Sequence, residues 1–103
     1  MFHDNLLKNV AICRTPTSLT VTLEMLDYQT ENPVTVVFDS IDWVSANLIG
    51  LIANEDCVDY IQECPWDDVP ALYACNPHGR KNYLIGLTGG STVRIVSLPM
   101  IVK

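Results

Sequence analysis

The fold is decided by residues 18–26, which read SLTVTLEML. Apolar side chains stand at Leu19, Val21, Leu23 and Met25, and threonine or glutamate occupies the positions between them. A period of two places the apolar side chains of a strand on one face. The stretch therefore predicts a β-strand with one buried face and one solvated face.

A second strand is predicted immediately upstream, over residues 6–13. Its apolar positions of equal parity are Leu6, Val10 and Ile12. Lys8 has the same parity and interrupts the pattern. The link at residues 14–17, Arg-Thr-Pro-Thr, is short and turn-forming, so the two strands are expected to pair as an antiparallel hairpin.

Downstream, residues 34–39 read VTVVFD and predict a third strand, rich in β-branched side chains. The next segment, residues 40–53, allows two interpretations. We favour a strand near Trp43, a turn near Ala46 and Asn47, and then another short strand. The alternative is a helix, in which Gly50 would cost about 1 kcal/mol relative to alanine. Its apolar face would consist of Leu48, Ile49, Leu51 and Ile52.

A short helix is predicted to start at Asn54, whose side chain suits an N-cap. Glu55 and Asp56 would lie in its first turn, where carboxylates favour the positive end of the helix dipole. Its inner face would carry Cys57, Val58, Ile61 and Cys64, and Pro65 would end it. Residues 65–82 then read as an irregular crossing, with a brief extended piece at residues 72–75.

The last twenty residues predict another hairpin, with strands at residues 83–88 and 91–102 around Gly89-Gly90. Pro99 is expected to force an edge, bulge or bend in the second of these strands. The chain is thus predicted to form one domain over residues 1–103. Its class is α+β: a mostly antiparallel, hairpin-rich sheet, as a partly open barrel or sandwich, with one short helix.

Composition supports a folded domain that binds no nucleic acid directly. Apolar residues make up 49% of the chain, which argues against disorder. The net charge is −6 and the isoelectric point is near 4.5, whereas phosphate backbones require a basic footprint. Neither a membrane span nor a signal-peptide pattern is recognised, so a cytoplasmic location is expected. In that compartment, free thiols are expected at Cys13, Cys57, Cys64 and Cys75.

The charges are distributed unevenly along the chain. No lysine or arginine occurs between Arg14 and Arg80, and eleven of the twelve carboxylates fall in that interval. Residues 15–79 therefore carry a formal charge of −11, and the remainder of the chain sums to +5. These carboxylates repel one another when the folded chain holds them close together, and a cationic partner would relieve that repulsion.

Three other patterns are weaker indications of chemistry. His3 and Asp4 are adjacent, but neighbours in a strand point to opposite faces, which argues against an acid–base pair. Cys64, Cys75 and His78, with Cys57 as a fourth donor, lack the close cysteine spacing of structural zinc sites, so no metal or other cofactor is expected. The glycines at residues 86–90 are typical of a hairpin rather than a phosphate-binding loop, because no lysine and helix follow them.

Two motifs resemble a known family. The chain opens with Phe2-His3-Asp4-Asn5 and Leu7, and its third strand ends in Phe38-Asp39-Ser40-Ile41. With the closing Gly-Gly hairpin, it is similar to small bacterial immunity-protein domains of the immunity protein 50 type, in which a Phe-His-Asp motif opens the domain and a Phe-x-x-Val/Ile motif ends a central strand. The resemblance implies that the protein neutralises a toxin without catalysis. Acidic immunity proteins commonly cover the basic active site of a nuclease, and the charge distribution of this chain would suit that role.

The candidate partner-binding site is an acidic segment that also contains two aromatic residues. Aromatic anchors ringed by charge are typical of protein interfaces. The predicted contact residues are Glu55, Asp56, Asp59, Tyr60, Glu63, Trp66, Asp67 and Asp68. The leading hypothesis is a non-enzymatic immunity protein that binds a basic toxin domain. The alternatives are a phage-type nucleic-acid mimic and a β domain that self-associates as a homodimer through Leu48–Ile52 or an edge strand.

Overall fold

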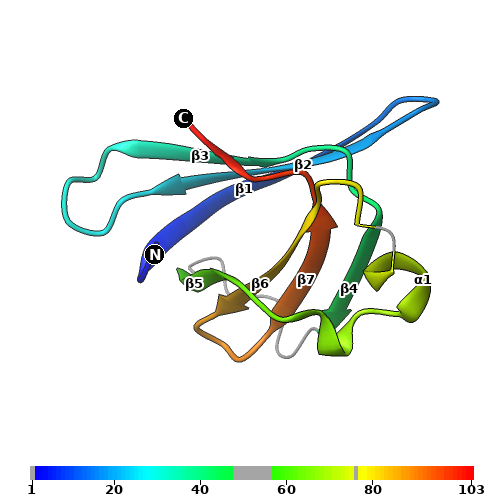
Figure 1. Cartoon of the computed structure of the whole chain (residues 1–103). Helices are drawn as coiled ribbons and strands as arrows, with labels where there is room; N and C mark the ends of the chain where they lie inside the picture. Colours follow the sequence, from blue (N-terminus) through cyan, green and yellow to red (C-terminus); the bar gives the residue numbers. More distant parts are fainter. Residues whose placement is uncertain (1, 48–56, 76) are drawn as a thin grey trace.

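The computed structural model describes residues 2–47, 57–75 and 77–103, and their strands form one antiparallel sheet (Figure 1). The sheet order is β4-β7-β6-β5-β1-β2-β3-β8. The strands are β1 (Asn5–Arg14), β2 (Leu19–Leu26), β3 (Pro33–Phe38), β4 (Trp43–Asn47), β5 (Cys57–Glu63), β6 (Lys81–Leu87), β7 (Thr92–Ser97) and β8 (Ile101–Val102). The prediction of a mostly antiparallel β fold is confirmed.

The sheet folds over so that its two halves face each other. Strands β1, β2, β3 and β8 form one half, and β5, β6, β7 and β4 form the other (Figure 1). Phe38 and Tyr83 meet across the interface with ring centroids 5.4 Å apart in an edge-to-face arrangement. The core consists of Val21, Leu23, Met25, Val36, Phe38, Val58, Ile61, Tyr83, Ile85 and Ile95. The end strands β4 and β8 are not paired with each other, so the sheet is open rather than a closed barrel.

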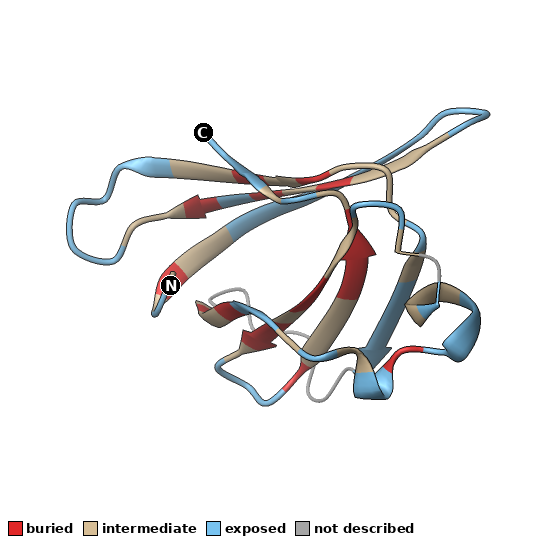
Figure 2. Cartoon of the chain, viewed as in Figure 1, coloured by how far each residue is buried: buried red, intermediate tan, exposed pale blue. Residues whose placement is uncertain are grey.

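The two predicted hairpins are present: β1 pairs with β2 over almost its whole length, and β6 pairs with β7 across the Gly89-Gly90 turn. β2 also pairs with β3. Pro99 lies in a break between β7 and β8, and β8 then joins the opposite half beside β3. Burial is greatest where the two halves meet, whereas the far end of the β1–β2 hairpin is exposed (Figure 2).

A β-bulge at Lys8 changes the faces of β1. Leu7 pairs with Met25, but the register then shifts, and Val10 pairs with Leu23. Leu7 therefore shares the inner face with Val10 and packs against the core. The expected equivalence of Leu6 and Val10 is wrong, because the extra residue at the bulge reverses the parity. Leu6 lies on the outer face.

The predicted helix from Asn54 to Cys64 is wrong over the described residues, because Cys57–Glu63 forms strand β5. A second bulge explains the error. The register with β6 shifts between Val58 and Tyr60, so Val58 and Ile61 both become buried although they are three residues apart. This spacing imitates the apolar face of a helix. Residues 54–56 lie outside the described part of the chain.

Two local predictions between the hairpins are also wrong. β4 runs through Asn47 and pairs with β7, so the turn expected near Ala46 and Asn47 is absent; residues 48–53 lie outside the described ranges. The extended piece expected at residues 72–75 is replaced by the single-turn helix α1 (Ala71–Ala74), preceded by a 3-10 turn, η1 (Trp66–Asp68). Pro70 sets the start of α1, and its carbonyl accepts hydrogen bonds from the amides of Tyr73 and Ala74.

Residues 65–75, here named the cover segment, pack on the outer face of the half that contains β6 and β7. Asn82 is fully buried beneath them, and its Nδ2 donates to the carbonyl of Pro65 at 2.6 Å. Val69 is buried in the same layer, and Tyr73 lies against Trp43 with ring centroids 6.5 Å apart. β6 and β7 are therefore covered on both faces.

Candidate functional site

The N-terminal residues 2–5 form a turn rather than a strand. Phe2 and Asp4 have φ values of 64° and 61°, and the amide of Asn5 donates to the carbonyl of Phe2 at 3.2 Å. The rule that neighbours point to opposite faces does not apply in a turn. The inference that His3 and Asp4 do not meet is consequently wrong: His3 Nε2 lies 3.1 Å from Asp4 Oδ2.

His3 also reaches β5. Its Nδ1 lies 2.9 Å from Asp59 Oδ1 and 3.2 Å from the Asp59 carbonyl. The hydrogen bond to that carbonyl and the charge of Asp4 are the main causes that raise the pKa of His3. A protonated imidazole can donate from both nitrogens, so this arrangement favours the cationic form. The turn is thereby attached to β5.

The same three side chains could also present donors to a metal ion. One imidazole nitrogen and two carboxylate oxygens lie within 4.8 Å of one another, and within the described ranges His3, Asp4 and Asp59 are the one such group. Both ring nitrogens already face a carboxylate. A divalent ion would therefore compete with the proton on His3, and the geometry fits the protonated side chain.

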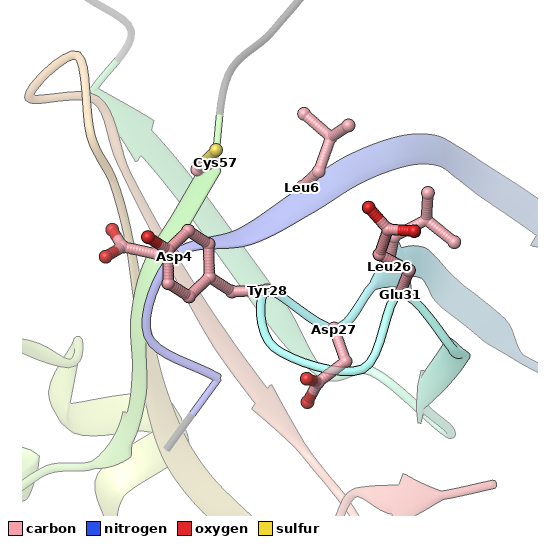
Figure 3. A pocket seen from close by; sticks show the side chains of 7 residues that line it. All are labelled: Asp4, Leu6, Leu26, Asp27, Tyr28, Glu31 and Cys57. Carbon is pink, nitrogen blue, oxygen red and sulfur yellow. The ribbon is translucent and has the colours of Figure 1, made fainter.

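Beside this turn lies a surface cavity of about 650 Å³, here named the acidic hollow (Figure 3). Its lining consists of Asp4, Leu6, Leu26, Asp27, Tyr28, Glu31 and Cys57. Leu6 and Leu26 are register partners on the outer face of β1 and β2. The bulge at Lys8 thus gives the hollow its apolar floor.

Figure 3 shows how the lining is arranged. Leu26 and Glu31 rise on one side, and the Tyr28 ring extends towards Asp4 and Cys57 on the other. The Asp27 carboxylate points the opposite way from Glu31, and that of Asp4 points outwards. Among the three carboxylates, that of Glu31 therefore points to the same side as the Leu6 and Leu26 side chains.

The β2–β3 turn holds these residues through local hydrogen bonds. Asp27 Oδ1 accepts from the amides of Gln29 and Thr30, both at 2.9 Å, and these bonds lower the pKa of Asp27. The side-chain oxygen of Asn5 accepts from the amide of Tyr28 at 3.2 Å. This bond joins the N-terminal turn to the β2–β3 turn. A second hollow of about 480 Å³ shares Asp4, Asp27 and Tyr28 with the first.

The predicted acidic segment does not form one cation-free face. Glu63 pairs with Lys81 across the β5–β6 ladder at 3.2 Å, and Asp68 meets Arg94 of β7 at 3.3 Å. Both carboxylates are exposed, so each pair contributes little to stability. Two carboxylates of the cation-free interval thus pair with basic side chains, Lys81 and Arg94, from strands that come later in the sequence.

The other predicted contact residues are dispersed. Asp59 contacts His3, and Asp67 is exposed in η1. Trp66 is half-buried, and the Tyr60 ring lies so close to Gly86 that a β-carbon there would overlap it. Glu55 and Asp56 lie outside the described residues.

The cysteines show no shared site within the described ranges. Cys13 and Cys75 are exposed thiols, and Cys64 is a half-buried thiol that accepts a weak hydrogen bond from Gln62 Nε2 at 3.5 Å. Cys57 is half-buried and lines the acidic hollow. His78 is exposed in a turn with φ of 49°.

Sequence reasoning missed the acidic hollow because its residues come from three separate segments. One signal was available: Asp27 precedes Tyr28-Gln29-Thr30-Glu31-Asn32, and an Asp side chain that caps amides two and three positions on is typical of a tight turn. Such a turn between the second and third strands brings Asp27, Tyr28 and Glu31 together. The predicted hairpin of the first two strands also brings this turn beside the start of β1, because Leu6 pairs with Leu26. The approach of Cys57 requires the β1–β5 pairing, which sequence alone does not reveal.

No protein-family model, curated protein sequence or solved structure matches the chain. The described helices are single turns, and none has the length and apolar character to cross a membrane.

Proposed function

We propose that this chain is a non-enzymatic binding protein that engages a basic protein partner. The observation that carries the proposal is the acidic hollow. It combines three carboxylates, an aromatic ring and two leucines, and the described residues of its lining include no lysine or arginine. A basic side chain that enters would gain attraction from the carboxylates and contact with apolar surface for its stem.

The net charge of −6 supports the same class of partner. Complementary potential accelerates encounter and excludes partners of like charge more than it raises affinity. An acidic surface with a shaped apolar floor therefore suits recognition of one basic surface.

Within this class, we propose an immunity protein that covers the active site of a basic toxin domain, such as a nuclease. The support is the resemblance of the opening and central motifs to immunity proteins of the type described above. Phe2, His3 and Asp4, which make up the opening motif, line the second hollow beside Tyr28. The opening motif therefore lies next to the acidic hollow.

The test uses the gene that neighbours the gene for this chain. Its product, or the C-terminal domain of that product, is expressed in cells with and without this chain, and growth is measured. We expect growth arrest without this chain and restored growth with it. No growth arrest, or arrest that this chain does not relieve, would reject the immunity role.

Two charge reversals would locate the binding face. Glu31→Lys lies in the acidic hollow, and Asp67→Lys lies in the predicted acidic segment. We expect Glu31→Lys to reduce protection and Asp67→Lys to leave it intact, with both variants folded by circular dichroism. The opposite result would assign binding to the acidic segment.

Displacement of DNA from the partner by this chain would indicate the nucleic-acid mimic.

Self-association is a second candidate, favoured by strand β4. β4 ends the sheet, and Trp43–Asn47 contains no charged residue and no proline. Soluble proteins usually protect edge strands with such residues. Two copies could pair their β4 strands across a twofold axis. Sedimentation would show a dimer that Ser45→Lys dissociates; a monomer at all concentrations would reject this candidate.

A further inference from the structure

We propose that the acidic hollow receives an arginine side chain of the partner, with Tyr28 and Glu31 as its principal contacts. This inference rests on the proposed function and specifies its ligand. Four features of the hollow carry it: the orientation of Glu31, the exposed Tyr28 ring, the apolar floor and the available space.

Glu31 supplies the directed charge. Its φ is 59°, a left-handed conformation, and its amide donates to the carbonyl of Asp27 at 2.9 Å, which fixes the end of the turn. Its side chain rises on the side of Leu26 (Figure 3) and has no hydrogen bond or ion pair with any described residue. A bidentate carboxylate–guanidinium contact is therefore available.

Tyr28 supplies the aromatic surface. It is 70% exposed, and its backbone amide is held by the side-chain oxygen of Asn5. Arginine is attracted to aromatic faces both as a cation and by stacking. The Tyr28 ring and the Glu31 carboxylate stand on different sides of the hollow, so an arginine that enters it has an aromatic ring on one side and a carboxylate on the other.

The floor favours an organic cation over a metal ion. Leu6 and Leu26 offer contact for a three-carbon stem, and guanidinium is more weakly hydrated than an ammonium group. A divalent ion would need several oxygens converging within about 2.5 Å. The Asp4 carboxylate is paired with His3, and the Asp4 and Asp27 carboxylates both point away from Glu31, so the three carboxylates do not converge on one point.

The volume suits a side chain presented by a folded partner. About 650 Å³ exceeds one arginine side chain and leaves room for part of the loop that carries it. The neighbouring hollow, beyond Tyr28, extends the surface towards His3 and Val102.

The test is a titration of the full chain with acetyl-arginine amide at low salt, followed by heteronuclear NMR. Acetyl-citrulline amide is the matched probe, because it has nearly the same shape and no charge. We expect saturable shifts at Leu6, Leu26, Tyr28 and Glu31 with arginine and none with citrulline. Shifts that are equal for the two probes, or no saturable shift at the hollow, would overturn the inference.

Three variants refine the test. Tyr28→Leu and Glu31→Gln are each expected to weaken arginine binding about three- to tenfold, as loss of one cation–π or charge contact implies. Tyr28→Phe should bind as the parent does, because it keeps the ring. Asp42→Asn, beyond the opposite end of β3, makes the same change of charge as Glu31→Gln and should have little effect.

Failure of this inference and failure of the proposed function are distinguishable. If Glu31→Gln and Tyr28→Leu still protect cells against the toxin, the chain binds a basic partner without inserting an arginine here. If arginine binds in the hollow but no growth protection is seen, arginine is supported as the ligand of the hollow and the immunity role is rejected.

Discussion

His3 shows how one side chain can connect the N-terminal turn to a strand in the middle of the chain. Its pKa is raised by the Asp59 carbonyl and by Asp4. A group whose pKa is raised on folding stabilises the protein fully below its unfolded value, here 6.5, and this contribution is lost as pH rises through the folded pKa. The attachment of the N-terminal turn is therefore expected to weaken as pH rises above 6.5.

Asp59→Asn is expected to lower the pKa of His3 towards its ordinary value, because the charge on its hydrogen-bond partner is removed. An NMR pH titration of the His3 imidazole measures the change. Asp67→Asn is the control, since Asp67 is exposed and contacts neither residue. An unchanged titration in Asp59→Asn would contradict the contact.

Gly86→Ala is expected to destabilise the protein by about 1 kcal/mol, at the lower end of the range for overpacking, because the Tyr60 ring can swing outwards. Urea denaturation measures the loss. In a Tyr60→Ala background the added methyl group meets no ring, and the cost of Gly86→Ala should largely disappear. An equal cost in both backgrounds would show that the clash is with something else.

At the scale of elements, the cover segment depends on one buried side chain. Asn82 is fully buried, its Nδ2 bonds to the Pro65 carbonyl, and its Oδ1 has no partner among the described residues. The amide therefore serves mainly to hold the start of the segment against β6.

Asn82→Ala is expected to lower the free energy of unfolding by about 2 kcal/mol, through the unsatisfied Pro65 carbonyl and the space left behind. Tryptophan fluorescence should report a loosened segment, because Trp66 lies within it and Trp43 packs against its Tyr73. Asn9→Ala, at an exposed position, is the matched control and should change stability little.

How far the sequence predicted each element depended on whether its pairing was local. The hairpins were predictable, because residues 19–25 alternate apolar and polar side chains and Gly89-Gly90 marks a turn. β5 was not, since its bulge between Val58 and Tyr60 imposes helical spacing on Val58 and Ile61. The acidic hollow was predictable only in part: its turn and the predicted β1–β2 hairpin place Tyr28 beside Asn5, but the approach of Cys57 depends on the long-range β1–β5 pairing.

At the scale of the whole molecule, a single hydroxyl helps to hold the C-terminal strand on the opposite half. The amide of Met100, just before β8, donates to Tyr83 Oη at 2.9 Å, and Tyr83 is buried against Phe38. β8 then pairs with β3, and Lys103 bonds to Thr35 through its backbone. Tyr83 thus connects the core to the last pairing in the sheet.

Tyr83→Phe is expected to cost about 1 to 2 kcal/mol, because the half-buried Met100 amide loses its acceptor. Amide hydrogen exchange should accelerate at Met100 and Lys103. Tyr73→Phe, in α1, removes a hydroxyl for which no hydrogen bond is present in the described structure and should leave exchange in β8 unchanged. Equal effects of the two changes would reject the role of this hydroxyl.

The arrangement of strands also has a kinetic consequence. β1 must find β5, and β4 must find β7, across about fifty residues, and β3 must find β8 across more than sixty. The β1–β2, β2–β3 and β6–β7 pairings are local. Closing long loops costs entropy before any contact repays it. We therefore expect the three hairpins to form early and the three long-range pairings to limit the rate. Refolding should take milliseconds to seconds, which leaves strand edges transiently exposed in the nascent chain.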